Sequence, residues 1–551
     1  MVAQILDTQG KTRAPPMFGL IQDRPLLISS ILTYAATYHP RRELVSALPD
    51  GTIHRQDYAA ASRRVAQLAH ALVEMGIRPG DRVGTLAWNG YRHFELFFAV
   101  SGIGAVLHTI NPRLFEEQIA YIINHGEDRL LFVDASFLPL VERLRPRLPT
   151  VERIIALSSD TTSTVGEDYE ELLEGHPELF LWTEFDERTA SVLCYTSGTT
   201  GDPKGVLYSH RSTVLHAMGA AQKSAMNLGC DDSIIAIAPM YHACAWGMPY
   251  LAAMTGAKLI LPGSRHDPES IVSLINAEGA TFACGVPTVW TMVLRHLSEK
   301  GGSLAPLNRT TIGGSAVSRA MIDGLTEHGV RALHLWGMTE MSPVGTVGTD
   351  TPEVLALPDA ERADVRAKQG RGQFLVELKI VGDDGEPLPH DGIQSGALWV
   401  RGPWVARAYF RRPDDDLLDA DGWFPTGDVA TIDPNGYMKI TDRVKDIIKS
   451  GGEWISTVDL ENAAVAHPAI ELAAVIGCFH PKWEERPLMI VQPSPGSDID
   501  HRQLSEFLDG RVARWWIPDA VETIAAMPLT ATGKIDKRAL RIRFAGYRFA
   551  S

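Results

Sequence analysis

The segment Tyr195-Thr196-Ser197-Gly198-Thr199-Thr200-Gly201-Asp202-Pro203-Lys204-Gly205 decides how the chain is interpreted. The apolar run Ala190–Tyr195 enters it like a buried strand of an α/β sheet, the usual support for a loop that holds phosphate. Its glycines let backbone N–H groups approach an anion, its hydroxyl groups add donors, and Lys204 adds charge. It is not a P-loop, because Pro203 rather than glycine precedes the lysine. A flexible surface turn would explain the glycines but not the strand, so the segment predicts a nucleotide site.

Composition limits the class of protein. A chain of 551 residues exceeds one compact core and predicts at least two domains. The net charge of -15, without a basic stripe, argues against nucleic acid. We expect no signal peptide in residues 1–20 and no integral membrane segment, because polar residues interrupt the longest apolar stretch, 96–110. Scattered cysteines without CxxC are expected to be buried thiols in a reducing cytoplasm: Cys194, Cys230, Cys244, Cys284 and Cys478.

The pattern along the chain changes twice. From Leu27 to about Gly370, helical periods such as Tyr58–Met75 alternate with β-branched runs, which indicates an α/β fold with covered sheets. Beyond Gly370, turn signals such as Asp433–Gly436 separate short strand patterns and predict a small β subdomain. About a hundred residues of βαβ-like pattern follow Asp446, enough for a second domain.

We therefore predict a large, multi-subdomain N-terminal domain over 1–444, with two covered α/β sheets plus the β subdomain. A small mobile α+β domain is predicted over 445–551.

Four further motifs follow the phosphate segment: Trp336-Gly337-Met338-Thr339-Glu340, Gly422–Asp428, Asp442–Asp446 and Pro528–Lys534. In this order, and over most of the chain, they resemble the adenylate-forming superfamily of acyl-CoA synthetases and luciferases. Lys449–Ser456, Pro239–His242 and Ala245-Trp246 resemble its medium- and long-chain fatty acid branch.

The resemblance implies two half-reactions, with ATP, Mg²⁺ and coenzyme A. A carboxylate attacks the α-phosphate of ATP to give acyl-adenylate and pyrophosphate, and the coenzyme A thiol then displaces AMP. A carboxylate and a triphosphate repel each other, so the first step needs cations and dipoles. By resemblance, Glu340 holds Mg²⁺ with help from Thr196. The expected phosphate ligands are Thr196, Ser197, Gly198, Thr199, Thr200 and Lys204.

The remaining nucleotide contacts are also implied by the resemblance. Asp428 would accept hydrogen bonds from the ribose hydroxyls, and Arg443 would reach the ribose and phosphate side. Trp336 stands where many relatives carry tyrosine, and its ring is expected to stack on adenine. Further nucleotide-lining residues are Gly313, Ser315, Gly337, Met338 and Thr339, and Gly314 would line the acyl group.

Lys534 is the residue expected to bridge the carboxylate and the α-phosphate; a solvated lysine before the helix Lys537–Arg543 is the alternative. It would occupy the space that coenzyme A needs next, so the resemblance implies domain rotation about the hinge Lys445. The loop Gly451, Gly452 and Glu453 would then border coenzyme A.

The acyl pocket is expected around Tyr241–Met248, including His242 and Trp246, with Trp246 as gate or as core residue. The segment has no lysine or arginine and favours an apolar monocarboxylic acid. We predict a medium- or long-chain fatty acid:CoA ligase. The alternatives are a ligase for a short thioether acid such as methylmercaptopropionate or for an arylalkanoate, a module that loads a carrier protein, and a nucleotide-binding regulator without catalysis. A homodimer is expected by resemblance to the long-chain branch.

Overall fold

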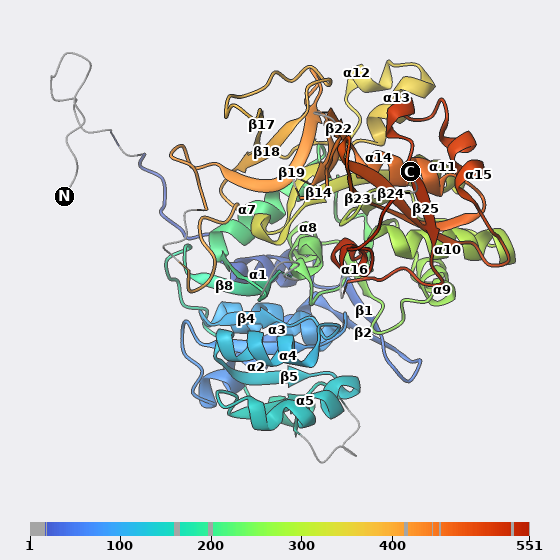
Figure 1. Cartoon of the computed structure of the whole chain (residues 1–551). Coiled ribbons are helices and arrows are strands. Elements are labelled where there is room, and N and C mark those ends of the chain that lie inside the picture. The colour runs from blue at the N-terminus through green and yellow to red at the C-terminus, as the bar shows by residue number, and fades with distance from the viewer. Residues whose placement is uncertain are drawn as a thin grey trace.

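The computed structural model describes residues 17, 19–158, 166–196, 202–412, 417–443, 445–450, 453–530 and 534–549. Figure 1 shows a large body that contains the blue, green and yellow elements, with the orange strands at one end and the red C-terminal elements at its side.

The first sheet has the strand order β7-β6-β5-β3-β4-β8-β9. β8 and β9 pair antiparallel and the other neighbours run parallel. Its strands are β3 Arg82–Leu86, β4 Val106–Thr109, β5 Asp128–Val133, β6 Arg153–Ala156, β7 Glu167–Asp168, β8 Ala190–Tyr195 and β9 Gly205–Ser209. The phosphate segment connects β8 to β9, which is the strand at one edge of this sheet.

The second sheet has the order β16-β15-β14-β13-β12-β10-β11-β1-β2 and is parallel from β14 to β1. Its strands are β1 Glu43–Ala47, β2 Ile53–Asp57, β10 Ser233–Ala236, β11 Lys258–Leu261, β12 Phe282–Gly285, β13 Arg309–Ile312, β14 Arg331–Gly337, β15 Val344–Val347 and β16 Arg371–Gly372.

Helices cover both faces of both sheets, because the strands between them are apolar on each face. A shared core of α1 Ile28–Tyr38, α2 Tyr58–Glu74, α3 Tyr91–Gly102, α7 His210–Ala221 and α8 Met248–Thr255 lies between the sheets. The outer face of the first sheet packs on α4 Glu116–Gly126 and α5 Leu138–Leu144. The outer face of the second packs on α9 Pro268–Glu278, α10 Pro287–Lys300 and α11 Arg319–Glu327. The remaining helices before the β subdomain are α6 Tyr169–Leu173, α12 Pro352–Leu355 and α13 Asp359–Arg366.

The predicted β subdomain is an antiparallel sheet with the order β17-β18-β19-β20. Its strands are β17 Glu377–Val381, β18 Gly396–Arg401, β19 Phe424–Ile432 and β20 Met438–Arg443. Their apolar side packs against Trp336 and Met341, so this sheet abuts the end of β14.

The C-terminal part has a sheet of its own: β21 Ile448–Ser450, β22 Glu453–Ile455, β23 Ile470–His480, β24 Glu484–Pro493 and β25 Ala520–Thr523. Separate cores pack α14 Thr457–Val465 with α15 His501–Leu508, and α16 Lys537–Arg543, against it. The βαβ-like expectation holds for β24 and β25, which pair parallel across α15. It is wrong for β23 and β24, because a connection of three residues, 481–483, joins antiparallel strands.

The α/β class with a further C-terminal domain is confirmed, while the boundary at 444/445 stays a prediction. Cys230 is exposed, contrary to expectation, and the other cysteines are buried. Within the described ranges, no helix combines the length and the apolar character needed to cross a membrane.

Candidate active site

The phosphate segment is fixed at both of its ends. Thr196 N donates to Lys204 O at 2.9 Å, and Lys204 N donates to Thr196 Oγ1 at 3.3 Å. These bonds continue the β8–β9 pairing up to the base of the loop. The predicted ligands Ser197, Gly198, Thr199 and Thr200 lie outside the described residues.

Glu340 lies in the short 3-10 helix η4, Thr339–Met341, and is 6% exposed. Tyr409 donates its phenol hydrogen to Glu340 Oε1 at 2.9 Å, and the Lys204 ammonium lies 4.6 Å from the centre of the Tyr409 ring. Burial raises the pKa of Glu340, while the Tyr409 hydrogen bond, Lys204 and Arg443 act in the opposite direction. Sequence reasoning missed Tyr409, because 69 residues separate it from Glu340 and no shared motif links them.

Two glycines allow the ends of β13 and β14 to approach their neighbours. A Cβ at Gly313 would lie 2.8 Å from Leu335 O, and one at Gly337 would lie 1.9 Å from Pro343 O. Gly314, with φ of +87°, and Ser315 are exposed beyond β13. Met338, which follows Gly337, donates its N–H to Pro343 O at 2.9 Å. These predicted nucleotide-lining residues therefore meet at the carboxyl edge of the second sheet.

Asp428 is 4% exposed and has two side-chain partners that the sequence also singled out. Trp336 Nε1 donates to Asp428 Oδ2 at 2.8 Å, and Arg443 Nε lies 3.2 Å from Asp428 Oδ1. Asp428 and Arg443 are direct partners of β19 and β20. The Trp336 indole is thus anchored at its N–H edge and packs within the core of the β subdomain.

Lys534 comes from the C-terminal part and lies among groups of the large part. The residue keeps exposed surface, yet removal of its amine from bulk water lowers its pKa to about 8, with a contribution from Arg443. Asp428 and Glu340 oppose that shift. Burial lowers the pKa of His242 to about 4, with a smaller contribution from the charge of Lys534, so His242 is neutral at pH 7. The structure therefore brings together residues from all four motifs that follow the phosphate segment, with His242 of the predicted acyl segment beside them.

The predicted acyl segment contains a left-handed turn. Ala243, Cys244, Ala245 and Trp246 have φ of 38°, 46°, 50° and 55°, and Gly247 follows at 83°. Residues with a Cβ rarely adopt this conformation, which costs about 1–2 kcal/mol for each residue. Trp246 is buried at 6% exposed. The ring of His216 lies 3.0 Å from the position of a Cβ on Gly247, so the imidazole takes the space beside this glycine.

The turn also contacts the strand that leads to the phosphate segment. Cys244 Sγ lies 3.3 Å from Cys194 Sγ, and Thr109 Oγ1 lies 3.4 Å from Cys194 Sγ. Both cysteines are free thiols. Their contact joins the predicted acyl segment to β8, which spacing along the chain did not reveal.

The predicted hinge is spanned by contacts on either side of it. The Asp442 carboxylate accepts from Thr457 N at 2.6 Å and from Thr457 Oγ1 at 3.0 Å. Lys439 of β20 pairs with Asp459 of α14 at 2.9 Å. Lys445 itself is exposed. Gly451 and Gly452 lie outside the described residues, as does the side chain of Glu453, whose backbone pairs with Ser450.

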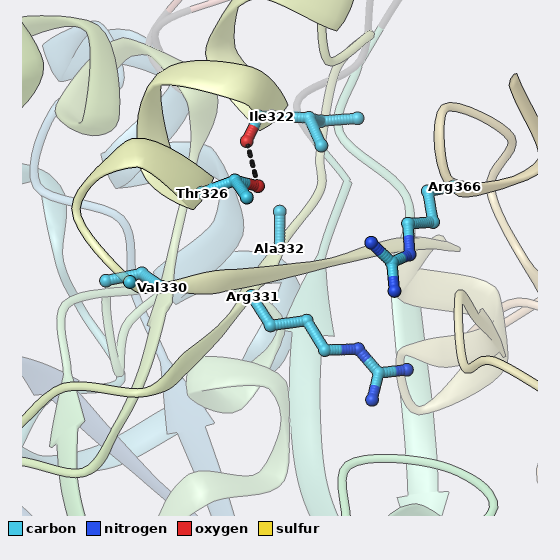
Figure 2. A pocket seen from close by; sticks show the side chains of 7 residues that line it. Ile322, Thr326, Val330, Arg331, Ala332 and Arg366 are labelled. Carbon is cyan, nitrogen blue, oxygen red and sulfur yellow. Dashed lines mark hydrogen bonds between the residues drawn. The ribbon is translucent and has the colours of Figure 1, made fainter. Parts of the chain in front are cut away.

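A small hollow of about 200 Å³ lies at the other end of β14. Its lining residues are Ile322, Thr326, Gly329, Val330, Arg331, Ala332 and Arg366. Figure 2 shows the guanidinium groups of Arg331 and Arg366 on the same side of it, and both pair with Asp350, at 3.3 and 2.6 Å. Arg331 begins β14 and Gly337 ends it, which separates this hollow from the Glu340 region by about 20 Å.

A C-terminal lysine near the buried carboxylates of a large α/β body agrees with the class of protein that the family matches show, an adenylate-forming enzyme. The chain belongs to the AMP-binding enzyme family, which matches residues 32–410, and the AMP-binding enzyme C-terminal domain matches residues 459–534. It is an acid-thiol ligase of the AMP-forming kind, and ATP and coenzyme A are the substrates of such ligases. The resemblance seen in the motifs is thereby confirmed.

Several known proteins are similar over nearly the whole chain. A 3-methylmercaptopropionyl-CoA ligase of Ruegeria lacuscaerulensis is 50% identical over 96% of this chain and 99% of its own length. A medium-chain fatty acid CoA ligase of Ectopseudomonas oleovorans is 46% identical over 96% and 98%. The crystal structure of an anthranilate CoA ligase in complex with anthranoyl-AMP has a TM-score of 0.83 and 25% identity, covering 95% of this chain and 98% of that one.

Proposed function

We propose that the enzyme activates an unbranched, apolar monocarboxylic acid, of which a medium- or long-chain fatty acid is the first candidate. The observation that supports the chemistry is the position of the Lys534 amine. It is close enough to Arg443, Asp428 and Glu340 for their charges to change its pKa. In our proposal this ammonium offsets the repulsion between the attacking carboxylate and the α-phosphate. Asp428 and Arg443 hold the ribose, and Lys204 holds the outer phosphates.

Glu340 suits Mg²⁺ as a partner. Among the described residues, no group of three or more His, Cys, Asp or Glu side chains could enclose a metal ion. Mg²⁺ keeps several waters and commonly takes one or two carboxylates together with substrate phosphates, so a single buried carboxylate beside a phosphate loop fits it. When bound, the ion would neutralise charge on the phosphate oxygens.

The walls of the proposed acyl pocket support an uncharged tail. Tyr241, Trp246 and the small residues between Trp246 and His242 are buried or nearly so. Burial raises the pKa of the Tyr241 hydroxyl, and Arg113, a cation from another part of the chain that the segment alone did not reveal, acts in the opposite direction. A dicarboxylic acid therefore belongs in any test of specificity.

A thioether acid is the second candidate, because the 50% identical relative is named for 3-methylmercaptopropionate. That acid has sulfur in place of one methylene of pentanoate, so a pocket for straight chains has room for both. A homodimer and the rotation about Lys445 stay predictions from the resemblance.

Measured kcat/KM values for a series of straight-chain acids test the proposal. Each buried CH₂ is worth about 0.8 kcal/mol, so we expect kcat/KM to rise about fourfold for each carbon until the pocket is full. Methylmercaptopropionate, 3-phenylpropionate and adipate complete the panel. A maximum at octanoate or longer supports the fatty acid. If kcat/KM for methylmercaptopropionate is more than tenfold higher than for pentanoate and octanoate, the thioether acid replaces the fatty acid as the proposed substrate. A preference for adipate would contradict an apolar pocket.

A further inference from the structure

Tyr409 lies in a segment between β18 and β19 that is tied to two parts of the candidate site. Ala406 N donates to Glu340 O at 2.7 Å, and Phe410 N donates to Gly205 O at 2.8 Å. A Cβ on Gly205 would lie 3.0 Å from Phe410 Cβ, so the segment packs closely on the residue after Lys204. The backbone on both sides of Tyr409 is therefore anchored, once to the Glu340 turn and once to β9.

A second tyrosine fixes the relative positions of these two anchors. Tyr208 of β9 donates its hydroxyl hydrogen to Thr339 O at 2.6 Å, and Tyr208 is 5% exposed. This hydrogen bond ties the turn that carries Glu340 to the strand that follows Lys204. A side chain placed between them meets a fixed geometry.

The side chain of Tyr409 makes a different contact with each charged residue. Its hydroxyl donates to Glu340 Oε1 at 2.9 Å, and its ring lies under the Lys204 ammonium at 4.6 Å. The residue is 9% exposed, so both contacts are partly removed from water and gain strength from that.

This arrangement keeps two opposite charges close without neutralising them. Within the ranges that the structure describes, Lys204 and Glu340 form no direct ion pair, and the phenol of Tyr409 contacts both groups. A direct pair would occupy the ammonium that the phosphates need and the carboxylate oxygen that a metal ion needs. A ring face attracts a cation but leaves its N–H donors available to other acceptors.

We propose that Tyr409 is a positioning residue that holds Glu340 and Lys204 apart and in place for the metal and phosphates of Mg·ATP, an inference that rests on the proposed roles of these two residues. The hydroxyl sets the orientation of the carboxylate, and the ring sets the position of the ammonium. The two contributions are separable, because phenylalanine keeps the ring and loses the hydroxyl, whereas leucine loses both.

Calorimetry measures the contributions of the hydroxyl and of the ring separately. The titrant is the non-hydrolysable ATP analogue α,β-methylene-ATP, with and without Mg²⁺. For Tyr409→Phe we expect the affinity without Mg²⁺ to match that of the unchanged enzyme and the gain from Mg²⁺ to fall about tenfold, the value of a hydrogen bond to a charged group. For Tyr409→Leu the affinity without Mg²⁺ should also fall, by about three- to tenfold, because the cation loses the ring face. The Mg²⁺ concentration for half-maximal pyrophosphate exchange should rise in parallel.

Tyr58→Phe is the matched control, since Tyr58 also donates a buried hydroxyl, to Ala257 O at 2.8 Å, far along the chain from the site. It should leave both affinities unchanged. Thermal unfolding of all variants shows that they fold. The proposal is overturned if Mg²⁺ increases the affinity of Tyr409→Phe for the analogue as much as that of the unchanged enzyme. It is also overturned if this variant loses the same affinity with and without Mg²⁺. Failure of the unchanged enzyme to bind the analogue or form any acyl-adenylate would instead contradict the proposed function.

Discussion

Lys534 has an amine whose charge state changes close to physiological pH. Its pKa of about 8 results first from removal from bulk water and then from Arg443, while Asp428 and Glu340 favour the ammonium. His242, the other titratable group that faces it, is neutral at pH 7 because its pKa is about 4. The proposed bridge needs the charged form, so adenylation should weaken as pH rises through about 8.

Pyrophosphate exchange measured from pH 6 to 10 checks this. We expect an alkaline decline in the unchanged enzyme and its absence in Lys534→Arg, because the guanidinium stays charged. As a control for enzyme stability, samples held at each pH are returned to pH 7 and assayed there. The same alkaline decline in Lys534→Arg would assign it to another group.

Loss of the side chain should separate the half-reactions. We expect Lys534→Ala to reduce adenylation by roughly 10²–10³, the usual effect of removing one charge-stabilising donor. Thioester formation from supplied acyl-adenylate and coenzyme A should be retained in part. Equal loss of both half-reactions, measured with the two substrates in parallel, would exclude a role specific to adenylation.

Trp336 should act through Asp428. Its indole N–H donates to Asp428 Oδ2 at 2.8 Å, so Trp336→Phe removes a hydrogen bond that orients the proposed ribose ligand. We expect the KM for ATP to rise about tenfold. Trp290→Phe is the control, because the buried Nε1 of Trp290 has no hydrogen-bond partner in the described part of the chain. Similar KM values for both variants would contradict the role.

At the scale of elements, the left-handed turn of residues 243–247 is the least expected feature. The strand Ala190–Tyr195 and the helix Lys537–Arg543 have the bounds that their sequence patterns predicted, because strand and helix periods are local properties. Residues with a Cβ at positive φ leave no such pattern. Only the surrounding packing maintains them, so sequence reasoning could place a pocket segment here but not its backbone.

The same substitution should have opposite consequences in this turn and in the helix after it. Ala245 and Ala252 are both fully buried, but Ala245 has φ of 50° and Ala252 lies within α8. Glycine in the helix costs about 1 kcal/mol. At position 245 it relieves a strain of about 1–2 kcal/mol. We expect Ala252→Gly to lower the midpoint of thermal unfolding and Ala245→Gly to leave it equal or higher. A larger loss for Ala245→Gly would mean that the turn is unstrained.

At the scale of the molecule, the contacts across the predicted hinge favour the arrangement in which Lys534 reaches the large part. The ion pair of Lys439 and Asp459 joins β20 to α14 with both groups partly exposed. Such pairs are worth about 0–1 kcal/mol. We therefore expect Asp459→Asn to lower adenylation up to about fivefold.

Thioester formation from supplied acyl-adenylate should not fall in this variant. Glu506→Gln, which breaks the Arg502–Glu506 pair inside α15, is the control and should change neither step. A loss of thioester formation in Asp459→Asn, measured by coenzyme A consumption, would mean that the pair stabilises both arrangements.

The motifs predicted most of the charged groups that meet here, since Lys204, Glu340, Asp428, Arg443 and Lys534 each lie in a recognisable stretch. They did not predict what lies between those groups. Tyr409, the Trp336–Asp428 bond and the Cys194–Cys244 contact depend on how distant segments pack, and no spacing along one segment reveals them.

The left-handed turn has a practical consequence for anyone who wishes to redesign substrate choice. Ala243, Cys244 and Ala245 already have small side chains, so trimming them offers little extra volume. The main-chain path of residues 243–247 forms the proposed wall of the acyl pocket. A single substitution therefore leaves the left-handed course of this wall in place. Grafting the whole 243–247 loop from a ligase of different preference, together with the partner of Cys244 on β8, is the more direct route to a different acyl group.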